Sequence, residues 1–165
     1  MGNGSHHVTI RRIGLADAEA LATFYNGLSD ESKRLFRPLS ENTDKNRCRE
    51  IVRDNEAETK YDLIAVLGDV VVGWAFVWNI DQPAECTFGI GVSDEWQGKG
   101  IGKKLMKRVL GTCRSRDLST VHLIVVQDNQ RAQNLYKQMG FVVTGTKAGA
   151  DGQDYFTMIK IISSS

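Results

Sequence analysis

The sequence predicts an α/β protein built on one mixed sheet, with helices on both faces of that sheet. Segments with the apolar spacing of strands and of helices alternate along most of the 165 residues. Consecutive strand-like segments in the middle of the chain indicate antiparallel neighbours, whereas strand–helix–strand units after them imply parallel ones. No linker, internal repeat or low-complexity tract interrupts this pattern. We therefore expect a single domain over residues 1–165.

The N-terminal part predicts one strand followed by helices. Residues 8–13 (VTIRRI) have the composition of a short strand. Residues 15–28 predict an amphipathic helix, because their apolar side chains recur at spacings of three and four. A short helix within residues 28–39, closed by Pro38, should follow, and then a polar helix over residues 43–58.

Three strands are expected in the middle of the chain. The first two are separated by Gly68-Asp69, a two-residue hairpin signal. The third contains Gly89 and Gly91, and glycines inside a strand mark a bulge or a close approach by a ligand or another backbone. The three strands cover residues 61–67, 70–78 and 86–92.

The last part of the chain predicts two helices that alternate with strands. The first helix begins directly after a glycine-rich turn, and its apolar stripe includes Ile101, Leu105 and Val109. The second ends at Gly140, a natural helix stop. The helices cover residues 101–116 and 129–140, and the strands cover residues 121–126, 141–146 and 154–162.

The composition argues against several functional classes. A formal net charge of +1 gives no overall electrostatic case for nucleic acid, although lysines gather around the glycine-rich turn. The longest apolar run is too short to span a bilayer, and residues 1–7 lack the apolar region of a signal peptide. We expect no membrane partner and a cytoplasmic protein, and whether residues 1–7 are native stays open. Three scattered cysteines and three histidines without ligand spacing predict reduced thiols and no metal site.

The glycine-rich turn lies in residues 92–104, which read VSDEWQGKGIGKK. A Walker P-loop needs Ser or Thr after Gly-Lys, and a dinucleotide fingerprint needs other glycine spacings, so neither motif fits. The segment Q-G-K-G-I-G instead has the form [R/Q]-x-x-G-x-[G/A]. Such glycines let the chain wrap closely around a pyrophosphate, with backbone N–H groups at a helix N-terminus. A glycine-rich turn with solvated lysines is the alternative that the segment alone leaves open.

A second block of residues, read together with the glycine-rich turn, resembles a known protein family. Residues 125–141 (VVQDNQRAQNLYKQMGF) follow the glycine turn in the order seen in the GNAT superfamily of acyl-CoA-dependent N-acetyltransferases, which nearly all of residues 8–162 resembles. The resemblance implies a GNAT-like fold, with a central mixed, mostly antiparallel sheet of about six or seven strands. It implies acetyl-CoA as co-substrate and no metal.

The resemblance also implies a cofactor site. Main-chain groups of residues 90–92 should pair with the pantetheine arm, and one N–H there should polarise the thioester carbonyl. The family has a bulge at this place in the strand. The turn should hold the pyrophosphate, and Asn129 should contact the pantetheine or cap the next helix. The cofactor residues are Ile90, Gly91, Val92, Gln97, Gly98, Lys99, Gly100, Ile101, Gly102, Lys103 and Asn129.

Two residues are catalytic candidates by the same resemblance. Tyr136 matches the tyrosine that protonates the departing thiolate, and its alternative is a core aromatic. Glu85 lies at the head of the strand that leads to the acyl site and is the candidate base, with an exposed strand-end carboxylate as its alternative. Weaker candidates for the base are Asp81, Asp128 and His122.

The acceptor should be a small-molecule or peptide amine, bound between the early helices and the loops that follow the strands. Residues 25–38 and 147–156 supply these segments. Trp74 and Trp78 could line the acceptor pocket or belong to the core, and Arg34 and Arg37 could bind an acidic substrate or be solvated. A homodimer is common in the family. The alternative function is a catalytically weak sensor domain that binds CoA or acyl-CoA.

Overall fold

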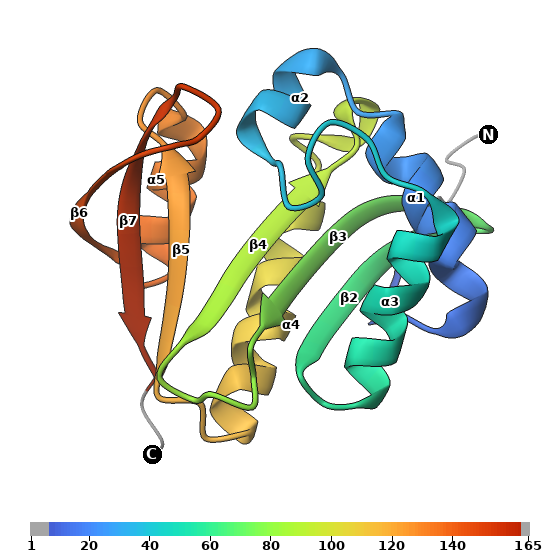
Figure 1. Cartoon of the computed structure of the whole chain (residues 1–165), viewed down its shortest axis with the longest axis horizontal. Coiled ribbons are helices and arrows are strands. Elements are labelled where there is room, and N and C mark those ends of the chain that lie inside the picture. Colours follow the sequence, from blue (N-terminus) through green and yellow to red (C-terminus); the bar gives the residue numbers. More distant parts are fainter. Residues whose placement is uncertain (1–6, 163–165) are drawn as a thin grey trace.

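A computed structural model describes residues 7–162 and has one seven-stranded sheet, with the strand order β1-β2-β3-β4-β5-β7-β6 (Figure 1). The strands are β1 (Thr9–Arg12), β2 (Lys60–Leu67), β3 (Val70–Trp78), β4 (Cys86–Val92), β5 (Thr120–Val126), β6 (Val142–Ala148) and β7 (Asp154–Ile161). All neighbours are antiparallel except β4 and β5. The predicted α/β fold, with a mixed and mostly antiparallel sheet, is confirmed.

Five α-helices and two short 3₁₀ turns complete the described chain. They are η1 (Leu15–Asp17), α1 (Ala18–Asn26), α2 (Asp30–Leu35), α3 (Lys45–Glu56), η2 (Asp94–Trp96), α4 (Ile101–Ser115) and α5 (Gln130–Gln138). Helix α2 ends before Pro38, as expected for a residue that cannot continue a helix. Among the described residues, no helix is both long and apolar enough to cross a membrane.

The helices cover both faces of the sheet, as predicted. Helices α1 and α3 pack on β2 and β3 through residues such as Leu21, Ile51 and Trp74. Helices α4 and α5 cover the other face, where Leu105 and Tyr136 contribute to a separate cluster (Figure 1). The alternation of side chains along the strands supplies both clusters, because neighbours in a strand point to opposite faces. Trp74 is completely buried in the first cluster and therefore lines no acceptor pocket.

One charged residue is fully buried in the first cluster. Asp62 accepts hydrogen bonds from the Asn55 side-chain amide (2.8 Å) and from the indole N–H groups of Trp74 (2.7 Å) and Trp78 (3.2 Å). Burial raises the pKa of Asp62 to about 6, although these donors favour the ionised carboxylate. The two tryptophans therefore serve this buried network.

The sheet opens between its two central strands. Strands β4 and β5 pair only at Cys86–Val121 and Thr87–His122 and diverge beyond that point (Figure 1). Of the two alternatives for the glycines of β4, the bulge is not observed, because β4 keeps an unbroken register with β3 from Thr87 to Val92. The opening is therefore a wedge between two strands that run in the same direction, and it positions the candidate site.

Candidate active site

A cavity of about 500 Å³ extends from the wedge to the start of α4. It brings together most of the residues that the sequence predicted, from three separate parts of the chain. The predicted residues in its lining are Ile90, Gly91, Val92, Gln97, Gly98, Gly100, Gly102, Lys103, Asn129 and Tyr136. Helix α2 adds Glu31, Ser32 and Leu35, with Phe36 directly after it. Lys99, Ile101 and Glu85 are not in the lining, and Ile101 is buried in the core instead.

The glycine turn forms one end of this cavity. Gly98 and Gly100 have φ angles of +77° and +86°, a region that residues with a Cβ atom rarely adopt. Gly100 is the N-cap of α4, so the free N–H groups of the first helical turn and the positive end of the helix dipole lie beside the cavity. A Cβ atom at Gly100 would meet no atom within 4 Å, which leaves open space above the turn.

Two cations lie at the turn, and the sequence pointed to only one of them. Lys103 lines the cavity as expected. Arg131 comes from α5, and its Nη2 atom would lie 3.4 Å from a Cβ atom at Gly98. Because Arg131 is distant in sequence from the turn, nothing in the glycine motif itself could have indicated it. The arrangement of backbone N–H groups and two cations suits a bound polyanion.

Helix α2 is held against the glycine turn by side chains of both segments. Asp94 accepts hydrogen bonds from the hydroxyl groups of Ser29 (2.6 Å) and Ser32 (2.9 Å) and from the Ser29 backbone N–H (3.1 Å). Gln97 donates from its Nε2 atom to the Val92 carbonyl (3.0 Å) and to the Ser32 hydroxyl (3.2 Å). Gln97 therefore connects the turn to β4 and α2.

The edge of β4 forms the wall of the wedge. Beyond Thr87, no residue in the described part of the chain pairs with this edge from β5, so its main-chain groups face the cavity. The glycines of β4 point to the face of the sheet that α1 and α3 cover. A Cβ atom at Gly89 would lie 2.3 Å from the Phe76 ring, and one at Gly91 would lie 2.4 Å from the Phe36 ring. The close approach that these glycines permit is thus made by aromatic side chains.

Tyr136 reaches the cavity from α5. Its ring packs edge-on against Phe88 and beside Phe141, and the residue is 8% exposed. Burial raises the pKa of the phenol, so it stays protonated at neutral pH and remains a proton donor. Within residues 7–162, the Tyr136 hydroxyl has no hydrogen-bond partner and is free to bond to a ligand.

Asn129 caps α5, which is one of the two roles considered from the sequence, and its place in the cavity lining is consistent with the other. Its Oδ1 atom accepts a hydrogen bond from the Ala132 backbone N–H (3.2 Å), which caps α5. The residue also lines the cavity. A capped helix start therefore lies directly beside the wedge.

The candidate bases are scattered. Glu85 is exposed, precedes β4 and lies at the opposite end of that strand from Ile90. Asp81 is exposed, and Asp128 is bound by Arg34. His122 lies at the closed end of the wedge, with its Nε2 atom 3.0 Å from the Ala84 carbonyl oxygen.

The one cysteine in β4 is not an activated nucleophile. Cys86 is fully buried and its sulfur lies near the backbone carbonyls of Asn79 and Gln82. Burial raises the pKa of the Cys86 thiol, so the reactive thiolate is disfavoured. The site therefore offers a phenol donor and main-chain groups. Among the described residues, no cluster of three metal-ligating side chains occurs.

Comparison with known proteins places this geometry in a family. The family model described as Acetyltransferase (GNAT) family matches residues 22–141. This chain belongs to the GNAT family. The matched GNAT region begins in α1 and ends at Phe141, so it includes the wedge, the glycine turn and Tyr136.

Individual acetyltransferases are similar to this chain in sequence or in fold. A 5-NmdU N-acetyltransferase of Pseudomonas phage PaMx11 is 36% identical over 78 residues, which are 47% of this chain and 54% of that protein. The chain thus spans about half the length of this relative. A GNAT acetyltransferase from Streptococcus pneumoniae has a TM-score of 0.81 at 20% identity, over 95% of this chain and 100% of the other. A GNAT phosphinothricin acetyltransferase from Sinorhizobium meliloti, in complex with acetyl-CoA, has a TM-score of 0.79 at 18% identity, over 96% and 90% of the two chains.

Proposed function

We propose that this protein transfers an acetyl group from acetyl-CoA to a primary amine, by direct attack in a ternary complex. The observation that carries the proposal is the wedge between β4 and β5, which has the glycine turn with Lys103 and Arg131 at one end and the buried phenol of Tyr136 along its side. A narrow slot of this kind suits a long thioester with a charged end. GNAT membership supports the same reaction class.

The residues of the cavity fit a CoA thioester. The open space above Gly100, the start of α4, Lys103 and Arg131 suit its pyrophosphate. The unpaired edge of β4 can receive the amide groups of the pantetheine arm, because extended chains bind to free strand edges through main-chain hydrogen bonds. When bound, the thioester supplies the activated acetyl group.

Main-chain and side-chain groups of this chain then stabilise the developing charge and donate the proton that the reaction needs. One N–H of residues 90–92 stabilises the negative charge that develops on the acyl oxygen as the amine attacks the carbonyl carbon. The carbon–sulfur bond breaks, and Tyr136 gives its proton to the departing sulfur. The amine releases its proton to solvent in the wedge, since Glu85 lies outside the cavity. The phenol regains a proton from solvent.

The proposal is tested by cofactor binding and by turnover. CoA should raise the melting temperature, whereas ATP and NAD should not. Acetyl-CoA consumption should then depend on an added amine, in a panel of polyamines, amino acids, aminoglycosides and peptides. Binding of CoA without amine-dependent turnover would favour the sensor-domain alternative, and a failure to bind CoA would refute both.

A further inference from the structure

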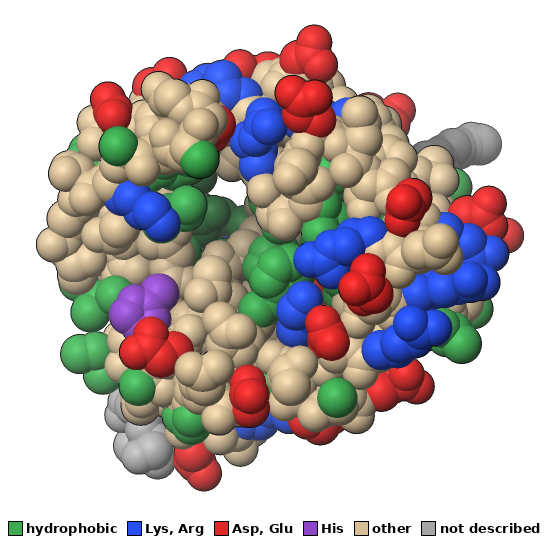
Figure 2. Space-filling model, viewed as in Figure 1, with side chains coloured by type: hydrophobic (Ala, Val, Ile, Leu, Met, Phe, Trp, Pro, Cys, Tyr) green, Lys and Arg blue, Asp and Glu red, His purple; other side chains and the backbone are tan. Residues whose placement is uncertain are grey.

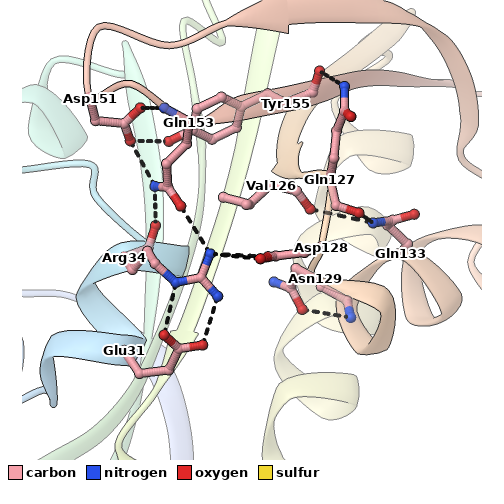
Figure 3. Close-up of polar contacts among 11 residues, drawn as sticks. Glu31, Arg34, Val126, Gln127, Asp128, Asn129, Gln133, Asp151, Gln153 and Tyr155 are labelled. Atoms are coloured by element: carbon pink, nitrogen blue, oxygen red, sulfur yellow. Dashed lines mark hydrogen bonds and ion pairs between the residues drawn. The ribbon is translucent and has the colours of Figure 1, made fainter.

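A bridge of side chains crosses the mouth of the wedge. Helix α2 lies on one side of this mouth, and the β5–α5 turn and the β6–β7 loop lie on the other (Figure 1). Figure 3 shows that side chains from all three segments meet around Arg34. These segments are far apart in the chain, so the bridge is a tertiary feature.

Arg34 makes the contacts that span the mouth. Its Nη1 atom donates hydrogen bonds to Asp128 Oδ1 (3.0 Å) on the β5–α5 turn and to Gln153 Oε1 (3.0 Å) on the β6–β7 loop. Gln153 donates in return from Nε2 to the Arg34 carbonyl oxygen (2.9 Å). The Nε and Nη2 atoms bind both carboxylate oxygens of Glu31 (2.8 and 2.7 Å), which fixes the guanidinium on α2.

The far end of the bridge is also held in place. Asp151 accepts hydrogen bonds from the Gln153 backbone N–H (3.0 Å), from Gln153 Nε2 (2.9 Å) and from the Tyr155 hydroxyl. These donors hold the pKa of Asp151 down at about 2. The Gly149 backbone N–H donates to the Gln153 carbonyl (2.8 Å), which closes the loop on itself. Gln153 is therefore presented to Arg34 by an ordered loop (Figure 3).

The bridge turns an open mouth into a bounded opening. Figure 2 shows an opening between the two halves of the molecule, with charged side chains of both signs above it. The paired residues Thr87 and His122 close the wedge at its other end. A ligand that reaches the thioester from this side must pass through the bounded opening while the bridge is intact.

We propose that Arg34 is a positioning residue that latches α2 to the β6–β7 loop and restricts the acceptor to an amine at the end of a slender, unbranched chain. This inference rests on the proposed function and specifies its substrate class. A linear chain can thread the bounded opening with its amine leading. An amine attached to a ring brings the ring to the opening. The ring is too bulky to pass through this opening while the latch is closed.

The contacts of the latch are weak enough for it to open. The side chains of Arg34 and Asp128 are 34% and 68% exposed, and exposed ion pairs of this kind are weak because water competes for both partners. Its removal should therefore change which acceptors are accepted more than it changes the stability of the fold. Arg37, an exposed arginine three residues later, carries the same charge and makes none of the bridging hydrogen bonds among the described residues, so it is the matched control.

The kinetic experiment compares 1,4-diaminobutane with kanamycin as acceptors. The wild-type protein should prefer the linear diamine in kcat/KM by 100-fold or more, on the order expected for a strong steric filter. Arg34→Ala should reduce this preference at least 10-fold by raising kcat/KM for kanamycin, with the Kd for CoA unchanged, whereas Arg37→Ala should retain it. An unchanged preference in Arg34→Ala, or an equal loss in Arg37→Ala, would overturn the proposal.

Two measurements judge the latch without turnover. CoA carrying an S-hexyl chain should bind the wild-type protein at least 10-fold more tightly than CoA carrying an S-anthracenylmethyl group, and Arg34→Ala should lose this difference. Hydrogen exchange of residues 149–153 should be faster in Arg34→Ala than in Arg37→Ala. If CoA itself does not bind, the proposed function fails, and exchange alone decides: equal exchange in the two variants would refute the latch.

Discussion

Two glycines of the turn place different requirements on their backbone. Gly100 has a φ of +86° at the N-cap of α4, where any Cβ atom is strained. Gly102 lies inside α4, where a Cβ atom would make ordinary 3.7 Å contacts with Ile90 and Val92. Substitutions at the two positions therefore distinguish an effect on the proposed anion site from an effect on helix α4 itself.

The first prediction uses this difference. Gly100→Glu should weaken CoA binding at least 100-fold, because a side chain and a negative charge would enter the space that we propose for the pyrophosphate. Gly102→Ala should bind CoA within about threefold of the wild-type protein and should fold equally well, since alanine favours helix over glycine. Calorimetric titration with CoA measures both variants. Retained micromolar binding in Gly100→Glu would contradict the pyrophosphate assignment.

Tyr136 allows a second prediction about a single atom. Its hydroxyl has no hydrogen-bond partner within residues 7–162, so Tyr136→Phe should leave the free energy of unfolding nearly unchanged. The same change should lower kcat by about 100-fold, the lower range for loss of a general acid, and leave the Kd for CoA within about twofold. Steady-state kinetics and calorimetry give the two values. An unchanged kcat would remove Tyr136 from the chemistry.

The sequence predicted individual residues well where a local motif specified them and poorly where a distant contact did. Gly100 and Asn129 have a backbone angle or a capping bond that depends on adjacent residues, so their positions were predictable. Arg131 reaches Gly98 only because α5 packs near the start of α4. Lys99 is adjacent to two cavity glycines, yet it is absent from the lining. Charge in a motif does not determine the direction of a side chain.

At the scale of elements, the position of α2 depends on a few polar contacts. The helix spans only Asp30–Leu35 and has no buried residue, so its own propensity and packing are weak. Asp94 provides acceptors for Ser29, the N-cap of α2, and for Ser32. Burial alone would raise the pKa of Asp94, but these hydrogen bonds outweigh it and lower the pKa.

The third prediction follows from this dependence. Asp94→Ala should cost about 1 kcal/mol of local stability, because an exposed, charged acceptor of three hydrogen bonds is lost. Helix α2 should exchange its amide hydrogens faster, and the Kd for CoA should rise about fivefold since α2 lines the cavity. Glu95→Ala removes the same charge from the same turn and should change neither quantity. Equal effects of Asp94→Ala and Glu95→Ala would show that the loss of a negative charge, and not the loss of hydrogen bonds, changes the exchange of α2 and the Kd for CoA.

The elements themselves were predicted in number and order, and the errors lie where two of them meet. The glycines of β4 suggested a bulge or a ligand. The space beside Gly89 and Gly91 is filled by Phe76 and Phe36 instead. Phe36 lies far earlier in the chain, and a sequence pattern does not reveal which ring will cover a glycine. The Arg34 bridge was missed for the same reason, since its partners come from two later loops.

At the scale of the whole molecule, the sheet separates two apolar clusters, and among residues 7–162 only one of these clusters contains a buried carboxylate. The cluster under α1 and α3 holds Asp62 among Asn55, Trp74 and Trp78. The cluster under α4 and α5 holds the phenol of Tyr136. Asp62 in the first cluster therefore makes folding stability depend on pH near neutrality. In the second cluster, burial raises the pKa of Tyr136, so this phenol does not titrate near neutral pH.

The fourth prediction concerns this pH dependence. The pKa of Asp62 in the folded protein is about 6, above its usual 3.8, so the folded state binds the proton more tightly than the unfolded chain does. This contribution to stability is complete below about pH 4 and is lost as the pH rises through about 6. The free energy of unfolding should therefore fall by about 1 kcal/mol between pH 5 and pH 7.

Urea unfolding at pH 5 and pH 7 measures this fall. Asp17 and Glu58 do not obscure it, because arginine partners lower their pKa values and both stay ionised across this range. Asp62→Asn replaces the titrating acceptor by an amide whose N–H groups oppose those of the tryptophans. The variant should be less stable at both pH values and should lose the slope between them. If the slope persists in Asp62→Asn, another group titrates, and the buried carboxylate is not what couples the fold to pH.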